Sequence, residues 1–240
     1  MIGLSKGRYA ARQAETPQDV AAAQALRARC FGLDTDADAF DNRCTHILIH
    51  RVSDNALVCC FRMMPLTGAT ISHSYSAQYY ELSALADYDG KMVEMGRFCI
   101  DPEAADPDIL RVAWGAMTSY VDAAGVELLF GCSSFAGTET ADYLDAFAML
   151  KARHLAPTRW LPSVKAPKVF KYAARLRRKP DAKKAMLRMP PLLRTYLMMG
   201  GWVSDHAVVD DQMNTLHVFT GVEIGSIPPA RKRLLRAVAG

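Results

Sequence analysis

The middle of the chain reads as a strand, a helix and a second strand, and this succession constrains the fold more than any other feature. Residues 91–100 are mostly apolar and are typical of a strand. Asp106-Pro107 is typical of a helix N-terminus, and Gly125 of a helix C-terminus. Residues 127–133 then have the apolar run of a buried strand. Together with an earlier hairpin, this unit predicts an α/β or α+β sheet covered by helices.

The other expected elements follow from caps, turns and apolar runs. Thr16-Pro17-Gln18-Asp19 has the N-cap, the proline and the early acid that open a helix. Ser53-Asp54-Asn55-Ala56 joins two apolar runs as a hairpin turn does. In chain order we expect a strand over 7–14, a helix over 16–30, hairpin strands over 46–52 and 57–64, a strand or helix over 75–85, a helix over 140–152, a strand over 169–176, a helix over 192–199, a strand over 217–224 and a helix over 231–238.

Composition points to an ordinary globular protein. Half of the 240 residues are hydrophobic and 22% are charged, and a chain of this length can bury a sizeable core. Every apolar run is shorter than the roughly 18–20 residues of a membrane-spanning helix. The first residues also lack the apolar centre of a secretory signal, so we expect a cytoplasmic protein. The six cysteines form no CxxC pair, and we expect neither disulfides nor a metal site.

The charges are distributed unevenly along the chain. Residues 1–150 contain 11 Lys or Arg and 20 Asp or Glu, whereas residues 151–200 contain 14 Lys or Arg and only Asp181 as an acid. A basic block on an otherwise acidic protein predicts an acidic partner, because a field of this size steers association. An acidic protein, an anionic membrane surface and nucleic acid all have the required charge.

The strand over residues 91–100 contains two charged residues, Glu94 and Arg97. Charged side chains in a core strand are costly unless they are paired or used. On a regular strand the two would point to opposite faces, because the side-chain period is two. A bulge at Gly96 would turn both toward one side, and glycine in a strand often marks a bulge. A structural Glu–Arg pair on an edge strand remains the alternative.

Two further motifs are weaker. Gly131-Cys132-Ser133-Ser134-Phe135 ends a strand as the GxSxG nucleophile elbow does, but Phe135 replaces the second glycine that the tight turn requires. Cys44-x-His46 is too closely spaced for a zinc pair. A hydrolase built on Ser133 is therefore a poor fit, and so is Cys132 as a nucleophile, because no histidine is near it in the sequence.

Taken together, several segments resemble the ornithine-lipid N-acyltransferase family, over about residues 7–225. The strand and the segment after the next helix carry the likeness with Glu94-x-Gly96-Arg97-x-Cys99-x-x-Pro102 and Gly131-Cys132-Ser133-Ser134-Phe135. Further matching segments are Gly7-Arg8-Tyr9, Leu26-Arg27-x-x-Cys30-Phe31, Phe40-Asp41-x-x-Cys44-x-His46, Pro190-Pro191-Leu192-Leu193-x-x-Tyr196-Leu197-x-x-Gly200-x-Trp202 and Ala207-Val208-Val209-Asp210.

The resemblance implies a GNAT-like fold, a mixed sheet flanked by helices, here with a basic C-terminal extension. It implies an acyltransferase core over residues 1–155 and a basic part over 156–240 that packs on this core or completes the same domain. The implied reaction moves a 3-hydroxyacyl group from acyl carrier protein to the α-amine of an amino acid such as ornithine or glutamine. The acyl-carrier phosphopantetheine thioester is then a co-substrate, and no cofactor is expected.

One segment departs from general acetyltransferases. Those enzymes grip the pyrophosphate of coenzyme A with a glycine-rich turn at a helix N-terminus. Here the turn reads Glu103-Ala104-Ala105-Asp106-Pro107-Asp108, without glycine or base and with three acids. The turn should repel a pyrophosphate and suits a donor arm carried by a protein. Arg8 and Arg12 are expected to help the basic block in docking that protein.

The chemistry assigns roles to the candidate residues. An aminolysis needs a base for the amine proton, for which Glu94 is the candidate, and Arg97 can bind the acceptor carboxylate or position Glu94. Backbone N–H groups near residues 96–98 are candidates for binding the oxyanion. The substrate-binding candidates are Asp41, His46, Gly96, Phe98, Cys132, Ser133, Ser134, Asp205 and Asp210. The carrier-docking candidates are Lys165, Lys168, Lys171, Arg175, Arg177 and Arg178.

Two other functions stay open at this stage. An acyl-homoserine-lactone synthase would share donor and fold but use S-adenosylmethionine as acceptor. A non-enzymatic protein could bind the membrane through the basic block and the apolar stretch from Leu192 to Trp202. The expected partners are acyl carrier protein and a small amino acid, with contact to the anionic inner face of the membrane left open and nucleic acid not expected.

Overall fold

The computed structural model describes residues 3–104 and 106–239, which form two compact units. Of the described residues, the first unit comprises 3–65, 93–104, 106–126 and 228–239, and the second comprises 66–92 and 127–227. Both units are therefore discontinuous in sequence. The expected boundary between residues 155 and 156 falls inside the second unit and stays a prediction.

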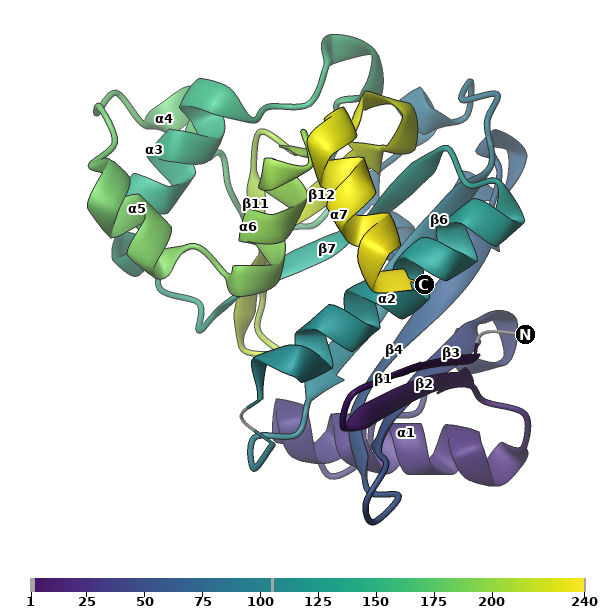
Figure 1. Cartoon of the computed structure of the whole chain (residues 1–240). Helices are drawn as coiled ribbons and strands as arrows, with labels where there is room; N and C mark the ends of the chain where they lie inside the picture. Colours follow the sequence, from purple (N-terminus) through teal and green to yellow (C-terminus); the bar gives the residue numbers. More distant parts are fainter. Residues whose placement is uncertain (1–2, 105, 240) are drawn as a thin grey trace. The chain divides into compact units, whose positions relative to one another are not determined.

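The strands of the first unit form an ordered series (Figure 1). β1 (Gly3–Lys6), β2 (Tyr9–Gln13), β3 (Thr45–Arg51), β4 (Leu57–Leu66) and β6 (Met92–Ile100) are neighbours in that order. The pairs from β1 to β4 are antiparallel, and the β3–β4 register shifts between Ile49 and His50. The expected hairpin over residues 46–64 is confirmed. The expected strand over 7–14 is in fact the second strand of a hairpin that begins at Gly3, with Gly7 in its turn at φ 62°.

Helices cover the first unit on both faces of these strands (Figure 1). α1 (Pro17–Phe31) begins with a capping box, in which Thr16 and Asp19 exchange hydrogen bonds, and α2 (Pro107–Ala124) begins at Asp106 and ends at Gly125 in the left-handed region. Both helices are confirmed with their predicted caps. Apolar residues of α1 pack with Leu48, Cys60 and Cys99, whereas α2 packs on β1, β2 and β3 and also contacts α7 (Pro229–Ala239).

The second unit is built on a long antiparallel pair. β7 (Leu128–Ala136) pairs with β12 (Thr215–Glu223) over its whole length, and β11 (Ala207–Asp210) and β9 (Val169–Phe170) follow on the far side of β12. β10 (Trp202–Val203) also pairs with β12, and β5 (Tyr80–Glu81) pairs with β8 (Ser163–Val164). Because side chains alternate along each strand, β7 and β12 present two different faces.

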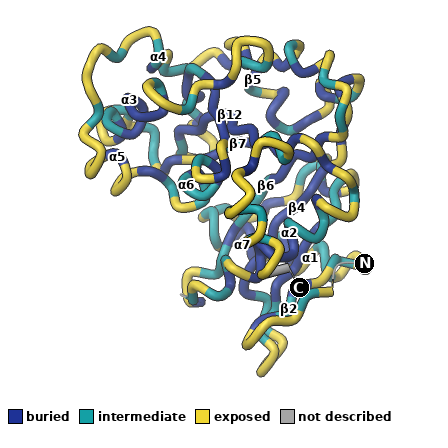
Figure 2. Tube along the Cα trace, turned by 45° about the horizontal axis from the view of Figure 1, so that its top comes forward, coloured by how far each residue is buried: buried dark blue, intermediate teal, exposed yellow. Residues whose placement is uncertain are grey.

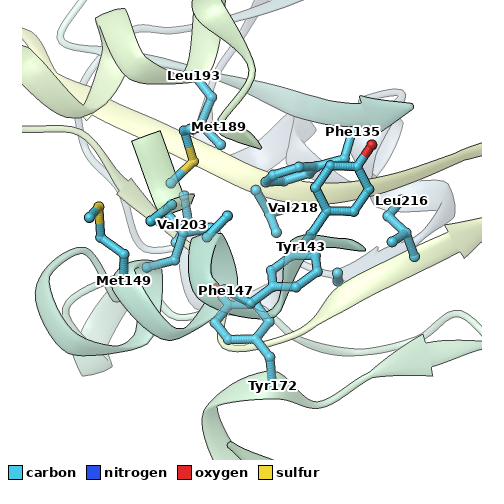
Figure 3. Close-up of a cluster of buried hydrophobic side chains, with 14 residues drawn as sticks. Phe135, Tyr143, Phe147, Met149, Tyr172, Met189, Leu193, Val203, Leu216 and Val218 are labelled. Atoms are coloured by element: carbon cyan, nitrogen blue, oxygen red, sulfur yellow. The ribbon is translucent and has the colours of Figure 1, made fainter. Parts of the chain in front are cut away.

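One face of β7 and β12 carries an apolar core (Figure 3). Phe135, Leu216 and Val218 pack there against residues of α3 (Leu144–Arg153), α5 (Ala182–Arg188) and α6 (Pro191–Met198). The Phe147 ring stacks on the Tyr172 ring at 5.1 Å between centroids. These contacts fix the helices of the basic block to the sheet, so the block belongs to a folded layer and is not a loose tail.

Two expectations about secondary structure are wrong. Residues 75–85 form no single continuous strand or helix, but two 3₁₀ turns (Ser76–Gln78 and Ser83–Leu85) on either side of the two-residue strand β5. Residues 169–176 change from β9 into the short helix α4 (Tyr172–Arg175). The Tyr172 hydroxyl donates to the Ser204 carbonyl, and Tyr172 is fully buried, so a tertiary contact determines the local conformation here.

Candidate active site

A buried cluster of charged side chains lies in the first unit. Three arginines and three aspartates meet there from α1, from the loop after α1, from β4 and from β6, and they are Arg27, Asp36, Asp38, Asp41, Arg62 and Arg97. We call these six residues the Arg–Asp cluster. Buried charges are tolerated only when paired, so the number of ion pairs here is expected on physical grounds.

Asp41 is the centre of the Arg–Asp cluster. Its carboxylate accepts hydrogen bonds from Arg27 at 2.8 Å, from Arg62 at 2.6 Å and from the side chain of Gln24 at 2.8 Å. Asp41 is 5% exposed. Burial tends to raise the pKa of this carboxyl, but the hydrogen bonds and positive charges of the two arginines outweigh it, and the pKa lies well below its usual range.

Asp36 and Asp38 connect the arginines to β6. The Arg27 Nε donates to Asp36 at 2.7 Å, and the Arg97 Nε lies 3.0 Å from the same carboxylate. Asp38 binds Arg62 at 2.6 Å and lies 3.5 Å from the Arg97 guanidinium. Arg97 is thus held by acids at the side of the cluster that β6 contributes.

The backbone of β6 is irregular at Arg97. Its φ of 53° is in the left-handed region, which costs a residue with a side chain roughly 1 kcal/mol or more. A Cβ on Gly96 would lie 3.8 Å from the Arg62 Nε, so position 96 faces the Arg–Asp cluster. Position 94 shares that face by the strand period, and Arg97 reaches the cluster only because the backbone turns there. The expected irregularity is present, but it falls on Arg97 and not on Gly96.

Glu94 lies close to the Arg–Asp cluster. It is 4% exposed, and its charge helps to raise the pKa of the Cys44 thiol to about 11, a shift caused first by burial and opposed by Arg62. His46 is equally buried and its Nε2 donates to the Asp41 carbonyl at 3.0 Å. Burial lowers the pKa of His46, so its imidazole is neutral near pH 7. Asp41, His46, Glu94 and Arg97, four of the predicted site residues, are therefore gathered at one place.

Phe98 is the last predicted residue in the first unit. Its ring stacks on the Phe61 ring with 5.6 Å between centroids and 24° between planes. The pair adds an apolar surface on β4 and β6, the two strands that carry Arg62 and Glu94. The first unit thus combines ionic groups with an aromatic surface on adjacent strands.

The remaining predicted site residues lie in the second unit. Cys132, Ser133 and Ser134 are inside β7, not at a turn after it, so the segment is no nucleophile elbow. Cys132 lies 3.4 Å from the Ser76 hydroxyl, and Ser134 pairs with His217 in register. Ser133 points to the opposite face, where its hydroxyl lies 2.9 Å from the Thr220 hydroxyl. The three residues therefore do not act as one group.

Asp205 and Asp210 have different surroundings. Asp205 is half exposed and accepts from the Nδ1 of the buried His206 at 2.6 Å. Asp210 is buried, and its carboxylate accepts from the Met213 N–H at 3.0 Å, as in a turn cap. Among the described residues, the Nε2 atoms of His206 and His217 have no hydrogen-bond partner.

The buried His217 makes stability depend on pH. Burial lowers its pKa to about 4 from 6.5. Below pH 6.5 the unfolded chain therefore binds a proton that the folded protein does not, and the free energy of unfolding falls from pH 6.5 to pH 4. We expect His217→Gln to remove up to about 3 kcal/mol of this fall. Urea denaturation at pH 7, 5 and 4 measures the free energy of unfolding.

The control is His73→Gln, at an exposed site. An equal fall of the free energy of unfolding in wild type and in His217→Gln would contradict the expectation.

The predicted carrier-docking cations are only partly available. The Lys165 ammonium donates to the Ala77 carbonyl at 2.6 Å, Lys168 pairs with Asp211, and Arg178 pairs with Asp145 at 2.9 Å. Arg177 donates to the Ala174 carbonyl, and Lys171 and Arg175 are exposed. The exposed arginines and Lys171 are the best placed of the six for an acidic partner.

The expected repulsion of a pyrophosphate by the segment before α2 stays a prediction. Asp106 caps α2, pairs with Arg8 at 2.6 Å and accepts from the Tyr9 hydroxyl at 2.8 Å. The charge of Asp106 is thus largely compensated. Ala105, in the same segment, lies outside the described residues. Arg12 pairs with Asp19 at 2.5 Å. Because Arg8 and Arg12 are both engaged in ion pairs, neither is an obvious docking residue.

Over residues 3–104 and 106–239 no group of three or more His, Cys, Asp or Glu side chains has a geometry that could hold a metal ion. Within the same residues, each helix is either too short or too polar to cross a membrane.

The sequence reasoning missed Arg27, Asp36, Asp38 and Arg62. For Arg62 a signal existed, since it is a lone charge inside the apolar run that forms β4, and the argument applied to Glu94 applies equally to it. Asp36 and Asp38 had no comparable signal because acids in a loop are usually solvated.

Comparisons with known proteins agree with this geometry. Residues 23–115, which include all of the Arg–Asp cluster, match the family described as acetyltransferase (GNAT) domain. The chain is 28% identical over 229 residues to an L-ornithine N(alpha)-acyltransferase of Rhodobacter capsulatus, with 88% of each chain covered. It is 28% identical over 240 residues to the Rhizobium meliloti protein of the same description, covering 90% of this chain and 80% of that one.

Among solved structures, an N-acyl amino acid synthase from uncultured soil microbes aligns over 97% of both chains with a TM-score of 0.50 and 10% identity. At that identity the likeness concerns the fold alone. The expected GNAT-like fold with a mixed sheet flanked by helices is confirmed, whereas the basic C-terminal extension stays a prediction.

The chain thus has a GNAT-like fold and is similar over most of its length to N-acyltransferases, which supports an N-acyltransferase enzyme. The similarity to L-ornithine N(alpha)-acyltransferases spans most of the chain, which confirms the resemblance found in the sequence.

Proposed function

We propose that this enzyme transfers a 3-hydroxyacyl group from acyl carrier protein to the α-amine of an amino acid, with ornithine as the first acceptor to test and glutamine the second. The observation that carries the proposal is the buried Arg–Asp cluster beside Glu94. The description of the relatives as L-ornithine N(alpha)-acyltransferases supports the choice of acceptor.

The cluster has the charges that an amino-acid acceptor requires. An amino acid carries a carboxylate and an ammonium group, and ornithine carries a second ammonium. Three guanidiniums and four carboxyl groups, counting Glu94, lie together in the first unit. Arg97 is the candidate for the acceptor carboxylate, because its guanidinium is the most exposed of the three at 14%. A bidentate Arg–carboxylate pair would fix the orientation of the amine.

The proposed reaction is an aminolysis without a covalent acyl-enzyme. Glu94 takes a proton from the acceptor ammonium, directly or through water, and the free amine nitrogen attacks the thioester carbonyl carbon. The C–N bond forms, and backbone N–H groups near Arg97 bind the oxyanion. The C–S bond then breaks, the attacking nitrogen gives its second proton to the departing thiolate, and Glu94 returns the first proton to solvent. The products are an N-acyl amino acid and the free thiol of the carrier.

The donor is proposed to be a carrier protein, because the basic block supplies a surface for an acidic partner. Lys171, Arg175 and Arg177 are the docking residues that their surroundings favour most. The remaining predicted cations, Lys165, Lys168 and Arg178, hold the segment to the rest of the second unit. A cytoplasmic location is proposed together with this donor.

An acceptor panel tests the proposal. Purified enzyme is incubated with 3-hydroxyacyl-carrier protein and each amino acid in turn, and free carrier thiol is followed together with the mass of the lipid product. Thiol release that depends on one amino acid and yields its N-acyl derivative is expected. Thiol release with every amino acid and with none would indicate hydrolysis, and lactone release from S-adenosylmethionine would indicate a lactone synthase; either result would overturn the proposal.

A further inference from the structure

The helix α5 presents an unusual combination of side chains to solvent. Met186 is 42% exposed and Leu187 is 80% exposed, although both are large and apolar. Lys183, Lys184 and Arg188 of the same helix are exposed, as is Lys179 shortly before it. We call these six residues the α5 surface. Figure 2 shows the segment around α4 and α5 as mostly exposed.

The α5 surface is the outer side of a helix that is firmly packed. Ala185 is fully buried and Met189 is 1% exposed, and both belong to the apolar core of the second unit (Figure 3). The side chains of Asp181 and Asp145 fix the start of the helix, since Asp181 caps it and Asp145 accepts the Asp181 N–H at 3.0 Å. Leu187 therefore projects from a rigid base, and repacking of the helix is not needed to expose it.

The cations of the α5 surface are not compensated within the protein. Among the described residues, Lys179, Lys183, Lys184 and Arg188 form no ion pair. Residues 177–188 contain six Lys or Arg, and the single acid, Asp181, is occupied by the backbone N–H groups of Lys183 and Lys184. The positive field around Leu187 is therefore available to an anionic partner.

We propose that the α5 surface docks on an anionic lipid bilayer, with the four cations at the headgroups and Met186 and Leu187 inserted at the acyl boundary. An exposed apolar pair surrounded by Lys and Arg is the side-chain arrangement of interfacial helices. The purpose of this docking, but not the docking itself, rests on the proposed function. An N-acyl amino acid with a long chain is an amphiphile, and it leaves the enzyme most readily into a membrane.

Vesicle sedimentation with the full-length protein tests the docking. Vesicles of phosphatidylcholine with and without phosphatidylglycerol are compared at low and high salt. Wild type is expected to sediment only with phosphatidylglycerol vesicles, and less at high salt because screening weakens the attraction. Lys183→Glu/Lys184→Glu should lower the partition coefficient at least about tenfold, and Leu187→Ser should lower it several-fold.

Matched control variants distinguish an effect of the α5 surface from a general effect of removing exposed apolar or basic side chains. Val52→Ser removes an apolar side chain that is 59% exposed in the first unit, and Arg29→Glu/Arg111→Glu reverses two cations whose side chains are each 60% exposed. Both controls should sediment like wild type. Equal losses in controls and α5 variants, or no loss in the α5 variants, would overturn the proposal.

Acyl transfer to a soluble amino acid without vesicles distinguishes this proposal from the proposed function. The α5 variants are expected to keep the wild-type kcat and the wild-type KM for the acyl-carrier protein there. A raised KM for the carrier with unchanged vesicle binding would make the α5 surface a protein-docking site and overturn the lipid proposal. Loss of acyl transfer in wild type, with vesicle binding intact, would instead refute only the proposed function.

Discussion

Replacing Glu94 by Gln is expected to lower kcat roughly 10²- to 10⁴-fold, because general-base catalysis contributes about that much and an amide cannot take the amine proton. KM for the acceptor should change far less, since the Arg–Asp cluster stays intact. In the wild type, kcat should fall at low pH because the catalytic base becomes protonated. The variant has no such base, so this fall of kcat at low pH should be absent. Steady-state thiol release between pH 5 and 9 measures both quantities.

Two further variants distinguish a loss of proton transfer from a loss of structure. Glu223→Gln makes the same change at the end of β12, where the side chain is 24% exposed, and should leave kcat close to wild type. Glu94→Asp keeps a carboxylate and should recover part of the lost rate. If Glu94→Gln is folded and retains wild-type kcat, Glu94 is not the base.

The second large effect concerns stability. Asp41→Asn is expected to lower the free energy of unfolding by about 3–5 kcal/mol, because it leaves the buried guanidiniums of Arg27 and Arg62 without their shared carboxylate. For a chain of this length that corresponds to a fall in Tm of roughly 10 °C. Thermal and urea unfolding at pH 7 measure the change.

The control for Asp41→Asn is an exposed ion pair. Asp211 pairs with Lys168, and the two side chains are 61% and 64% exposed, so Asp211→Asn should change the free energy of unfolding by less than about 1 kcal/mol. A comparably small effect of Asp41→Asn would mean that the Arg–Asp cluster does not stabilise the first unit, and that its charges are retained for another reason.

Local signals predicted the long elements well. The N-caps Thr16 and Asp106 and the C-cap Gly125 act through neighbouring backbone groups, so a short stretch of sequence contains the whole interaction. The hairpin of β3 and β4 is equally local. The predictions of the short elements failed because distant groups determine these elements. Tyr172, for example, turns the chain into α4 through its contact with Ser204.

The candidate site was predictable only in part. Glu94 and Arg97 stood out because charges in an apolar strand need a reason, and a distortion between them was inferred from Gly96. That the left-handed residue would be Arg97 could not be inferred, since a side chain there is disfavoured and tolerated only when its surroundings hold it. Asp36 and Asp38 reach Arg97 through tertiary structure, which no local pattern encodes.

The most direct test of acyl transfer to the amine uses ornithine labelled with ¹⁵N at the α position. The enzyme, 3-hydroxyacyl-carrier protein and labelled ornithine are incubated together, and the product is examined by ¹⁵N-edited NMR and mass spectrometry. An amide proton coupled to the labelled nitrogen, formed in step with free carrier thiol and formed far more slowly with Glu94→Gln, is the predicted result. Thiol release without a labelled amide, or an amide on the unlabelled side-chain nitrogen, would contradict it.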